Sequence, residues 1–408
     1  MRTNKASLLL RPALSLVLLL CAVFLAFSTW RVGAQQQTNQ QRPRRVTGEQ
    51  NQSGSSSSNS PEEVDEGDVV RVETQLVSVP AIVTDHDGHP LSGLLRENFV
   101  VYEDGQPQTL SNFGTTETPF EIALLLDTSG STRDDVVLIR QAANAFIDAL
   151  RPGDRVAVEA FNTAENAQGK IATVEVLSPL TGDRKALRKA IENLGASNGT
   201  PFYDALVRVT TDIFRQPANE EVRGRRAVVA LTDGVDSTSN SDFAQAKAKL
   251  TSAGVASYFI QVNTEDFVED RLMKDCQDDG RLSLSQKQLE RYRRIFVPAA
   301  NKEDYADFCK MGPFERMSIS RDLYNLARRE MNDLAKASGG KNFLAATLQD
   351  ARAAFGRVAA DIGTQYSLGY YPSNKARDGK YRAIKVEVKG LKDKTTVRAR
   401  EGYYAQKN

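Results

Sequence analysis

Residues 119–263 alternate short apolar runs with amphipathic stretches, and this alternation constrains the fold more than any other feature of the chain. Ile122–Leu126 and Ala227–Leu231 are continuous apolar runs, which are typical of strands buried on both faces of a parallel sheet. Residues 139–150, between them, place apolar side chains on one face of a predicted helix. The pattern predicts an α/β fold, a doubly wound and mostly parallel sheet with helices on both faces.

Residues 264–320 interrupt this alternation with a charged and irregular stretch, which we interpret as an insertion. The alternation resumes with a predicted helix over 320–337, a strand over 342–345 and a helix over 348–362. The α/β domain is therefore expected to span residues 119–363, with the insertion at 264–320.

Strand patterns flank this domain on both sides, in residues 67–118 and 364–408. Each flank offers about three strands, and a sheet that small needs a second layer to bury its apolar face. We expect the two flanks to pair into one small β-sandwich-like accessory domain, with the α/β domain inserted between them. The alternative, in which each flank packs separately on the α/β domain as edge strands, stays open.

The N-terminus has the pattern of an export signal. Basic residues precede an apolar run over residues 13–27, and Val32–Ala34 supply small residues for cleavage, so residues 1–34 are predicted to be a signal peptide. An uncleaved membrane anchor is the alternative. Residues 35–66 are polar and almost free of large apolar side chains, which predicts a disordered linker. We expect an exported protein that is periplasmic, envelope-associated or secreted.

The formal net charge is +1, and no basic stretch resembles a nucleic-acid-binding surface. Two of the three cysteines, Cys276 and Cys309, lie beyond the predicted signal peptide and inside the insertion. An even pair in an oxidising compartment predicts one disulfide. Two unpaired thiols are the alternative.

Polar oxygen ligands fall at three loop positions of the predicted α/β domain. Asp127, Ser129 and Ser131 follow one buried strand, Asp233 follows another, and Thr200 opens a helix. Open α/β sheets bind their ligands beyond the carboxyl ends of the strands. Two carboxylates and three hydroxyls, without Cys or His, suit a hard cation such as Mg²⁺, with Mn²⁺ or Ca²⁺ as alternatives.

This set resembles the metal-ion-dependent adhesion site of the von Willebrand factor type A (VWA) family, whose pattern is D-x-S-x-S followed by a Thr and an Asp. The resemblance implies that Ser129, Ser131 and Thr200 coordinate the ion, and that Asp127 and Asp233 act directly or through water. It also implies a protein or peptide partner that supplies an acidic residue to the metal. The flanks at 83–106 and 366–404 are similar to the VWFA-related family of acidobacterial secreted proteins.

Two short stretches resemble a hydrolase motif and a calcium loop, but the residues around them do not fit either site. Gly195–Gly199 matches the G-x-S-x-G hydrolase pattern, but a predicted helix precedes it and no His follows His89. The stretch from Asp85 to Gly88 looks like a calcium loop, yet Arg96 occupies the position of the required Glu, so we interpret it as a turn. We expect that the protein is not an enzyme.

The predicted function is an exported adhesion or assembly module that binds a partner through a divalent cation. Two alternatives stay open: a structural envelope protein whose metal site only stabilises the fold, and a cation-dependent enzyme that uses the ion as a Lewis acid. Contact with a membrane is expected only if the signal is uncleaved.

Overall fold

The computed structural model describes residues 76–407 except 133–135, 168, 217–221, 223, 273–283 and 392. The predicted signal peptide (1–34), the predicted linker (35–66) and Cys276 lie outside the described residues, so those predictions stay untested. Within the described ranges, no helix combines the length and the apolar character that crossing a bilayer requires.

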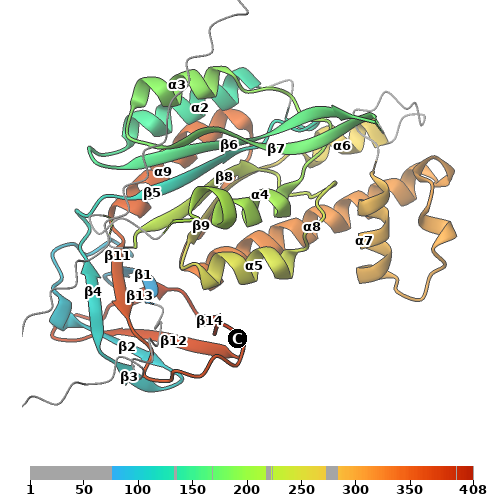
Figure 1. The fold of residues 1–408 in the computed structure, drawn as a ribbon. Coiled ribbons are helices and arrows are strands. Elements are labelled where there is room, and N and C mark those ends of the chain that lie inside the picture. Colours follow the sequence, from blue (N-terminus) through green and yellow to red (C-terminus); the bar gives the residue numbers. More distant parts are fainter. Residues whose placement is uncertain are drawn as a thin grey trace, which may run out of the picture. The chain divides into compact units, whose positions relative to one another are not determined.

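A six-stranded sheet forms the centre of the α/β domain, in the order β10-β9-β8-β5-β6-β7 (Figure 1). The strands are β5 (Glu121–Leu126), β6 (Arg155–Asn166), β7 (Gly169–Thr181), β8 (Arg226–Thr232), β9 (Ala256–Val262) and β10 (Lys341–Ala345). Strands β10, β9, β8, β5 and β6 run parallel, whereas β7 pairs antiparallel with β6. The predicted doubly wound, mostly parallel sheet is confirmed.

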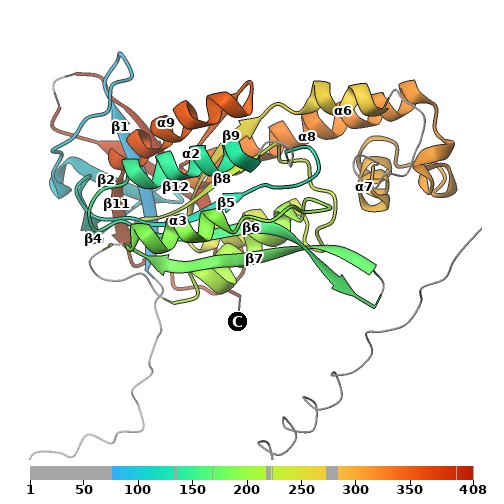
Figure 2. The ribbon, with the colours of Figure 1, turned by 90° about the horizontal axis from the view of Figure 1, so that it is seen from above.

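Helices cover both faces of this sheet, which explains the continuous apolar strands. One face packs against α2 (Val136–Ala149), α3 (Arg184–Glu192) and α9 (Ala351–Gly363), which lie over the sheet in Figure 2. The other face packs against α4 (Phe202–Arg208), α5 (Phe243–Ser252) and α8 (Pro313–Ser338). Along β5, Leu124 joins the first core and Leu125 the second, so both faces of the strand must be apolar.

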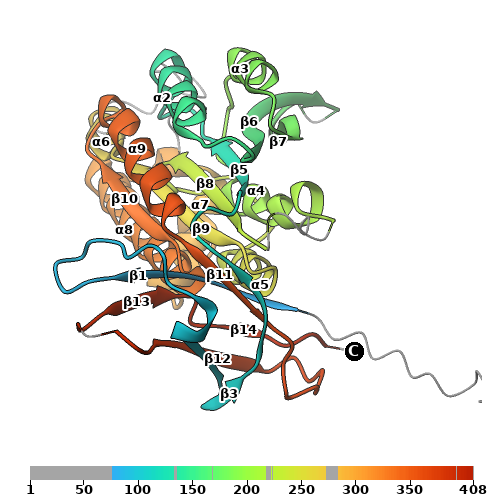
Figure 3. The ribbon, with the colours of Figure 1, turned by 90° about the vertical axis from the view of Figure 1, so that its left-hand side faces the viewer.

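The flanking strands form two four-stranded antiparallel sheets, ordered β13-β1-β11-β4 and β14-β12-β2-β3 (strands labelled in Figure 1; Figure 3 gives a second view). The strands are β1 (Val77–Thr84), β2 (Phe99–Glu103), β3 (Gln106–Gln108), β4 (Leu110–Gly114), β11 (Tyr366–Tyr370), β12 (Tyr381–Val388), β13 (Thr396–Ala399) and β14 (Gly402–Tyr404). N-terminal β1 lies between C-terminal β13 and β11, and N-terminal β2 pairs with C-terminal β12.

Side chains from both flanks share one hydrophobic core in this sandwich, in which Val79 and Phe99 meet Tyr366 and Val386. The shared accessory domain is therefore confirmed, and separate packing of the two flanks is wrong.

The insertion is helical, so the expectation of an irregular stretch is wrong. It contains α6 (Glu265–Leu272) and α7 (Gln286–Phe296), and α8 already begins at Pro313 rather than at residue 320. These helices build a hydrophobic core of their own, with Leu289 and Tyr292 buried in it. Cys309 lies in a short 3₁₀ helix (Phe308–Lys310). Its proposed disulfide to Cys276 stays a prediction, because Cys276 is outside the described residues.

One buried arginine joins the two chain crossings between the domains. The Arg225 guanidinium donates hydrogen bonds to the carbonyl oxygens of Thr116 and Thr118, in the segment that enters β5. It also donates to the carbonyl oxygen of Ile362, at the end of α9, at 3.0 Å. The entry and exit of the α/β domain are thus fixed by the same side chain.

Candidate metal site

The predicted ligands gather where the strand order of the sheet reverses. Asp127 directly follows β5 and Asp233 directly follows β8, and these two strands are parallel neighbours. The chain passes from β5 to β6 on one side and later returns to β8 on the other, which makes this edge a topological switch point. Sheets of this kind place their ligands at that point.

The Asp127 carboxylate lies buried under the first loop. Its Oδ1 atom accepts a hydrogen bond from the Ser129 amide at 2.9 Å, and its Oδ2 atom accepts one from the Thr232 hydroxyl at 2.6 Å. These contacts hold the loop against the next strand. The Ser129 side chain is 2% exposed, and its Oγ atom has no hydrogen-bond partner among the described residues.

The Asp233 carboxylate is surrounded by hydroxyl groups. Its Oδ2 atom accepts hydrogen bonds from Ser131 Oγ at 2.8 Å and from Thr264 Oγ1 at 2.7 Å. The Tyr324 hydroxyl lies 2.7 Å from Thr264 Oγ1 and 3.5 Å from the same carboxylate oxygen. Thr264 and Tyr324 were not predicted from the sequence, although Thr264 follows β9 at the same edge of the sheet and the strand-end rule could have found it.

The two carboxylates shape the electrostatics of the site. Burial, and next the negative charge of Asp233, raise the pKa of Asp127 to about 7. Burial and then Asp233 likewise raise the pKa of the Tyr324 hydroxyl well above its usual value. Among the described residues, the hydrogen bonds to both carboxylates come from amide and hydroxyl groups. Because these donors are neutral, no cationic side chain in this described hydrogen-bond network balances the negative charge of the carboxylates.

Thr200 is fixed by the loop that follows Asp233. Its amide donates to Ser237 Oγ at 2.8 Å, and its carbonyl accepts from the Ser237 amide at 3.0 Å. A cavity of about 170 Å³ opens above these loops, and Ser129, Ser131, Thr200 and Asp233 line it. Asp127 does not line the cavity but contacts the Ser129 amide directly below it. The structure therefore brings together all five predicted residues.

These residues fit a hard cation. The donor set is made of oxygen atoms, and Mg²⁺, Mn²⁺ and Ca²⁺ prefer oxygen ligands. A buried polar atom without a partner costs free energy unless something outside the protein chain satisfies it. Ser129 lines the cavity together with the buried Asp233, and its Oγ atom has no partner within the described part of the chain, so a cation bound there would satisfy it.

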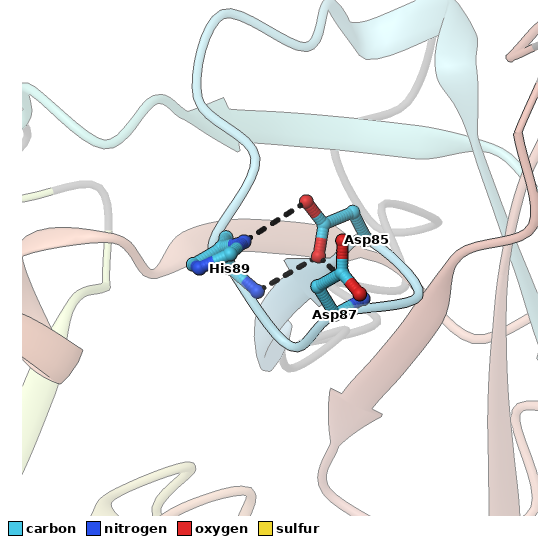
Figure 4. A group of neighbouring side chains, drawn as sticks. All are labelled: Asp85, Asp87 and His89. Atoms are coloured by element: carbon cyan, nitrogen blue, oxygen red, sulfur yellow. Dashed lines mark hydrogen bonds and ion pairs between the residues drawn. The ribbon is translucent and has the colours of Figure 1, made fainter.

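A second group of polar side chains lies on a surface turn of the accessory domain (Figure 4). Asp85 Oδ1 accepts hydrogen bonds from the amides of Asp87 and His89, and Thr84 pairs with Pro90 to close the hairpin. The carboxylate therefore caps its own turn, which agrees with the turn interpretation of this stretch.

Ser197, in the G-x-S-x-G match, also has a structural contact. Its Oγ atom donates to the Gly199 carbonyl at 2.7 Å and is buried. Its hydroxyl therefore supports the loop that leads into Thr200.

A comparison with known protein families agrees with this fold, in its strand order, its helices between strands and the loops that carry the five predicted residues. Residues 121–287 match the model of the von Willebrand factor type A domain. The chain contains a VWA domain. No curated protein matches the chain in sequence.

Several solved structures resemble this VWA-containing chain. The von Willebrand factor type A protein from Catenulispora acidiphila is 13% identical, with a TM-score of 0.38, over 82% of this chain and 74% of that one. Proximal thread matrix protein 1 from the mussel byssus is 13% identical, with a TM-score of 0.39, over 67% of this chain. The match spans about half of the mussel chain, 51%. The SpRpn10 VWA domain is 18% identical over 36% of this chain and 76% of its own, with a TM-score of 0.26.

Proposed function

We propose that the protein is an exported binding module that engages a protein partner through a divalent cation held by Asp127, Ser129, Ser131, Thr200 and Asp233. The observation that carries this proposal is the buried Ser129 Oγ atom, which has no hydrogen-bond partner among the described residues and belongs to a residue that lines a cavity together with Asp233. VWA domains generally mediate protein–protein interactions, which favours a binding role. We also propose that the chain is exported and that it is related to the acidobacterial VWFA-related family, which its flanking segments resemble.

Each residue has a distinct part in this proposal. Ser129, Ser131 and Thr200 offer neutral oxygen ligands, while Asp127 and Asp233 supply the negative charge. If the two carboxylates act through water, the direct ligands Ser129, Ser131 and Thr200 are neutral, and the cation then attracts a carboxylate from outside the chain. Thr264 and Tyr324 hold Asp233 in position through their hydroxyl groups. We propose no catalytic activity.

The test is calorimetric titration of the protein with Mg²⁺ and Mn²⁺. Ser129→Ala should weaken cation binding at least tenfold, because it removes a ligand without disturbing any protein hydrogen bond. Asp127→Ala should also remove binding while the sheet stays folded. Ser257→Ala is the matched control, since Ser257 Oγ is likewise buried with no partner in the described ranges, but Ser257 does not line the cavity. Equal affinities in wild type, Ser129→Ala and Asp127→Ala would refute the cation site.

The binding role has its own test in envelope extract from the source cells. Proteins retained by the immobilised chain in Mg²⁺ should be released by a chelator and should not be retained by Ser129→Ala. Retention that is the same in all three conditions would favour a structural protein whose metal site only stabilises the fold.

A further inference from the structure

Helix α7 of the insertion carries a lysine in its first turn. Lys287 lies two positions after the N-cap residue Ser285, where the positive end of the helix dipole disfavours a cation. The ammonium group nevertheless uses all of its donors. Nζ donates to the carbonyl oxygens of Thr238 and Ser239 at 2.7 and 3.0 Å, and to Asn240 Oδ1 at 2.9 Å. Lys287 therefore stabilises the loop that follows β8 rather than its own helix.

The N-cap residue of α7 binds the same loop one position earlier. Ser285 Oγ accepts the capping hydrogen bond from the Gln288 amide at 3.1 Å and donates to the Ser237 carbonyl at 2.6 Å. Four consecutive loop residues, 237–240, thus accept hydrogen bonds from the start of α7. Loops are generally more mobile than the elements they connect, so contacts along the whole loop restrict its movement.

This loop supports the predicted ligand Thr200. The Thr200 amide donates to Ser237 Oγ at 2.8 Å, and its carbonyl accepts from the Ser237 amide at 3.0 Å. Gly199 also lies against the loop, because an added Cβ atom there would be 2.7 Å from Thr238 Cγ2. Hydrogen bonds therefore lead from Ser285 through Ser237 to Thr200, and Lys287 fixes the next residues of the same loop.

The middle of α7 is anchored to the helix that begins just after Thr200. Arg291 donates to the two carboxylate oxygens of Glu330 at 2.7 and 2.6 Å, and the Tyr203 hydroxyl donates to the same carboxylate at 2.6 Å. The Arg291 guanidinium also lies 4.9 Å from the centroid of the Tyr203 ring. Tyr203 belongs to α4, so α7 is held in place relative to Thr200 at its first turn and at its middle.

We propose that α7 is a positioning element for the candidate cation site, in which Lys287 fixes the loop that holds Thr200. The proposal rests on the cation-dependent function argued above. Mg²⁺ demands near-ideal octahedral geometry, whereas Ca²⁺ accepts about six to eight oxygen ligands in flexible arrangements. A Thr200 held in one place therefore favours Mg²⁺, and a Thr200 that can shift loses Mg²⁺ affinity before it loses Ca²⁺ affinity.

The test is calorimetric titration of the full chain with Mg²⁺ and, separately, with Ca²⁺. Lys287→Met should weaken Mg²⁺ binding about tenfold, as expected for a residue that orients a metal ligand, and Ca²⁺ binding less than about twofold. Removing a positive charge would by itself strengthen the binding of both cations, so the expected change has the opposite sign.

Arg294→Met is the matched control. Arg294 is also exposed on α7, and its substitution removes the same charge. Among the described residues, however, the hydrogen bonds from α7 and its cap to residues 237–240 come from Ser285 and Lys287. The control should keep the Mg²⁺-to-Ca²⁺ affinity ratio of the wild type, and a fall in the control equal to that in Lys287→Met would overturn the positioning role.

Two further measurements separate this inference from the proposed function. In a Thr200→Ala background, Lys287→Met should change the Mg²⁺ affinity less than about twofold, because Lys287 acts through Thr200. In the presence of a chelator, hydrogen exchange over residues 198–204, followed by mass spectrometry, should be at least about threefold faster in Lys287→Met than in wild type.

Each outcome has one meaning. An unchanged affinity ratio or unchanged hydrogen exchange in Lys287→Met would overturn the positioning role and leave the proposed function intact. If the wild-type protein binds neither ion, the proposed function is overturned, and the exchange measurement in chelator alone decides whether Lys287 positions Thr200.

Discussion

Glu159, in the middle of β6, is a buried carboxyl group without a hydrogen-bond partner. Its side chain is 0% exposed, and neither carboxylate oxygen has a partner among the described residues. Burial raises the pKa of this carboxyl well above its usual value, and the positive charge of Arg208 offsets only part of that effect. The folded protein therefore holds a proton on Glu159 at a pH at which the unfolded chain has released it.

This difference predicts a dependence of stability on pH. Above the unfolded pKa of about 4.3, the folded state binds more protons than the unfolded state, so the free energy of unfolding falls as the pH rises towards the folded pKa. The loss is at most about 1.4 kcal/mol for each pH unit. Glu159→Gln cannot ionise and should be more stable than wild type at pH 8 by a larger margin than at pH 5.

Urea unfolding of both proteins at pH 5 and pH 8, in the presence of a chelator, measures this margin. Other titrating groups contribute equally to both proteins, so the comparison isolates residue 159. A margin that is the same at both pH values would show that Glu159 is ionised in the folded state.

The candidate site shows which residues a sequence can reveal. Asp127 and Asp233 were predictable because each follows a buried parallel strand, and the carboxyl ends of such strands meet at one edge. Thr264 obeys the same rule after β9 but lacks a motif. Tyr324 lies 60 positions beyond Thr264, inside α8, and its hydroxyl reaches Asp233 only through the packing of that helix on the sheet. No local pattern encodes that contact.

At the scale of elements, the junction between α8 and β10 depends on a pair of glycines. Gly339 ends α8 with a positive φ of 81°. At Gly340, a Cβ atom would lie 1.9 Å from the backbone oxygen of Ser257 in β9. This contact leaves no room for a side chain unless the strands separate.

Gly340→Ala should therefore lower the free energy of unfolding by roughly 3 kcal/mol, as expected for overpacking against backbone atoms. Gly356→Ala is the matched control, because Gly356 lies on an exposed position of α9, where an added Cβ atom would have no neighbouring atom within 4 Å. That substitution should raise stability by about 0.5–1 kcal/mol, since alanine favours the helix. Thermal unfolding of both variants checks the pair, and equal shifts would show that the close approach of β9 and β10 is not rigid.

The insertion at residues 264–320 contains both cysteines of the predicted disulfide. We predict that the protein is exported and that Cys276 and Cys309 then form a disulfide, which would stabilise the fold by about 3 kcal/mol through the unfolded chain. Peptide mapping by mass spectrometry without reduction, on protein isolated from the exported fraction, should detect the linked pair. Two thiols that both react with an alkylating agent would contradict it.

Helices were not predicted in the insertion because many charged residues separate the apolar residues that have helical spacing. Leu289, Tyr292 and Phe296 lie on one face of α7, and Ser285 with Gln288 forms a capping box at its start. These signals are local and were available in the sequence. What the sequence could not show is that the face packs onto α8, which lies outside the predicted insertion for most of its length.

At the scale of the whole molecule, the accessory domain depends on both ends of the described chain. Deleting residues 364–408 removes β11, β12, β13 and β14, and thereby every strand that pairs with β1. We expect limited proteolysis of this truncated protein to cut rapidly within residues 77–114, while the α/β domain stays resistant. Continued protection of residues 77–114 would show that these strands are held by the α/β domain instead.

Because the accessory domain combines strands from both flanks, β1 can pair with its neighbours only late in the synthesis of the chain. Strand β1 is made before the α/β domain, yet its neighbours β11 and β13 are made after it, and the hydrogen bond from Arg400 to the Ser78 carbonyl joins residues 322 positions apart. Contacts this distant in the chain form slowly, and until then both edges of β1 are open to other strands. Only a finished molecule can cover them, so a chain whose synthesis stops early displays an uncovered strand that quality-control proteases can recognise.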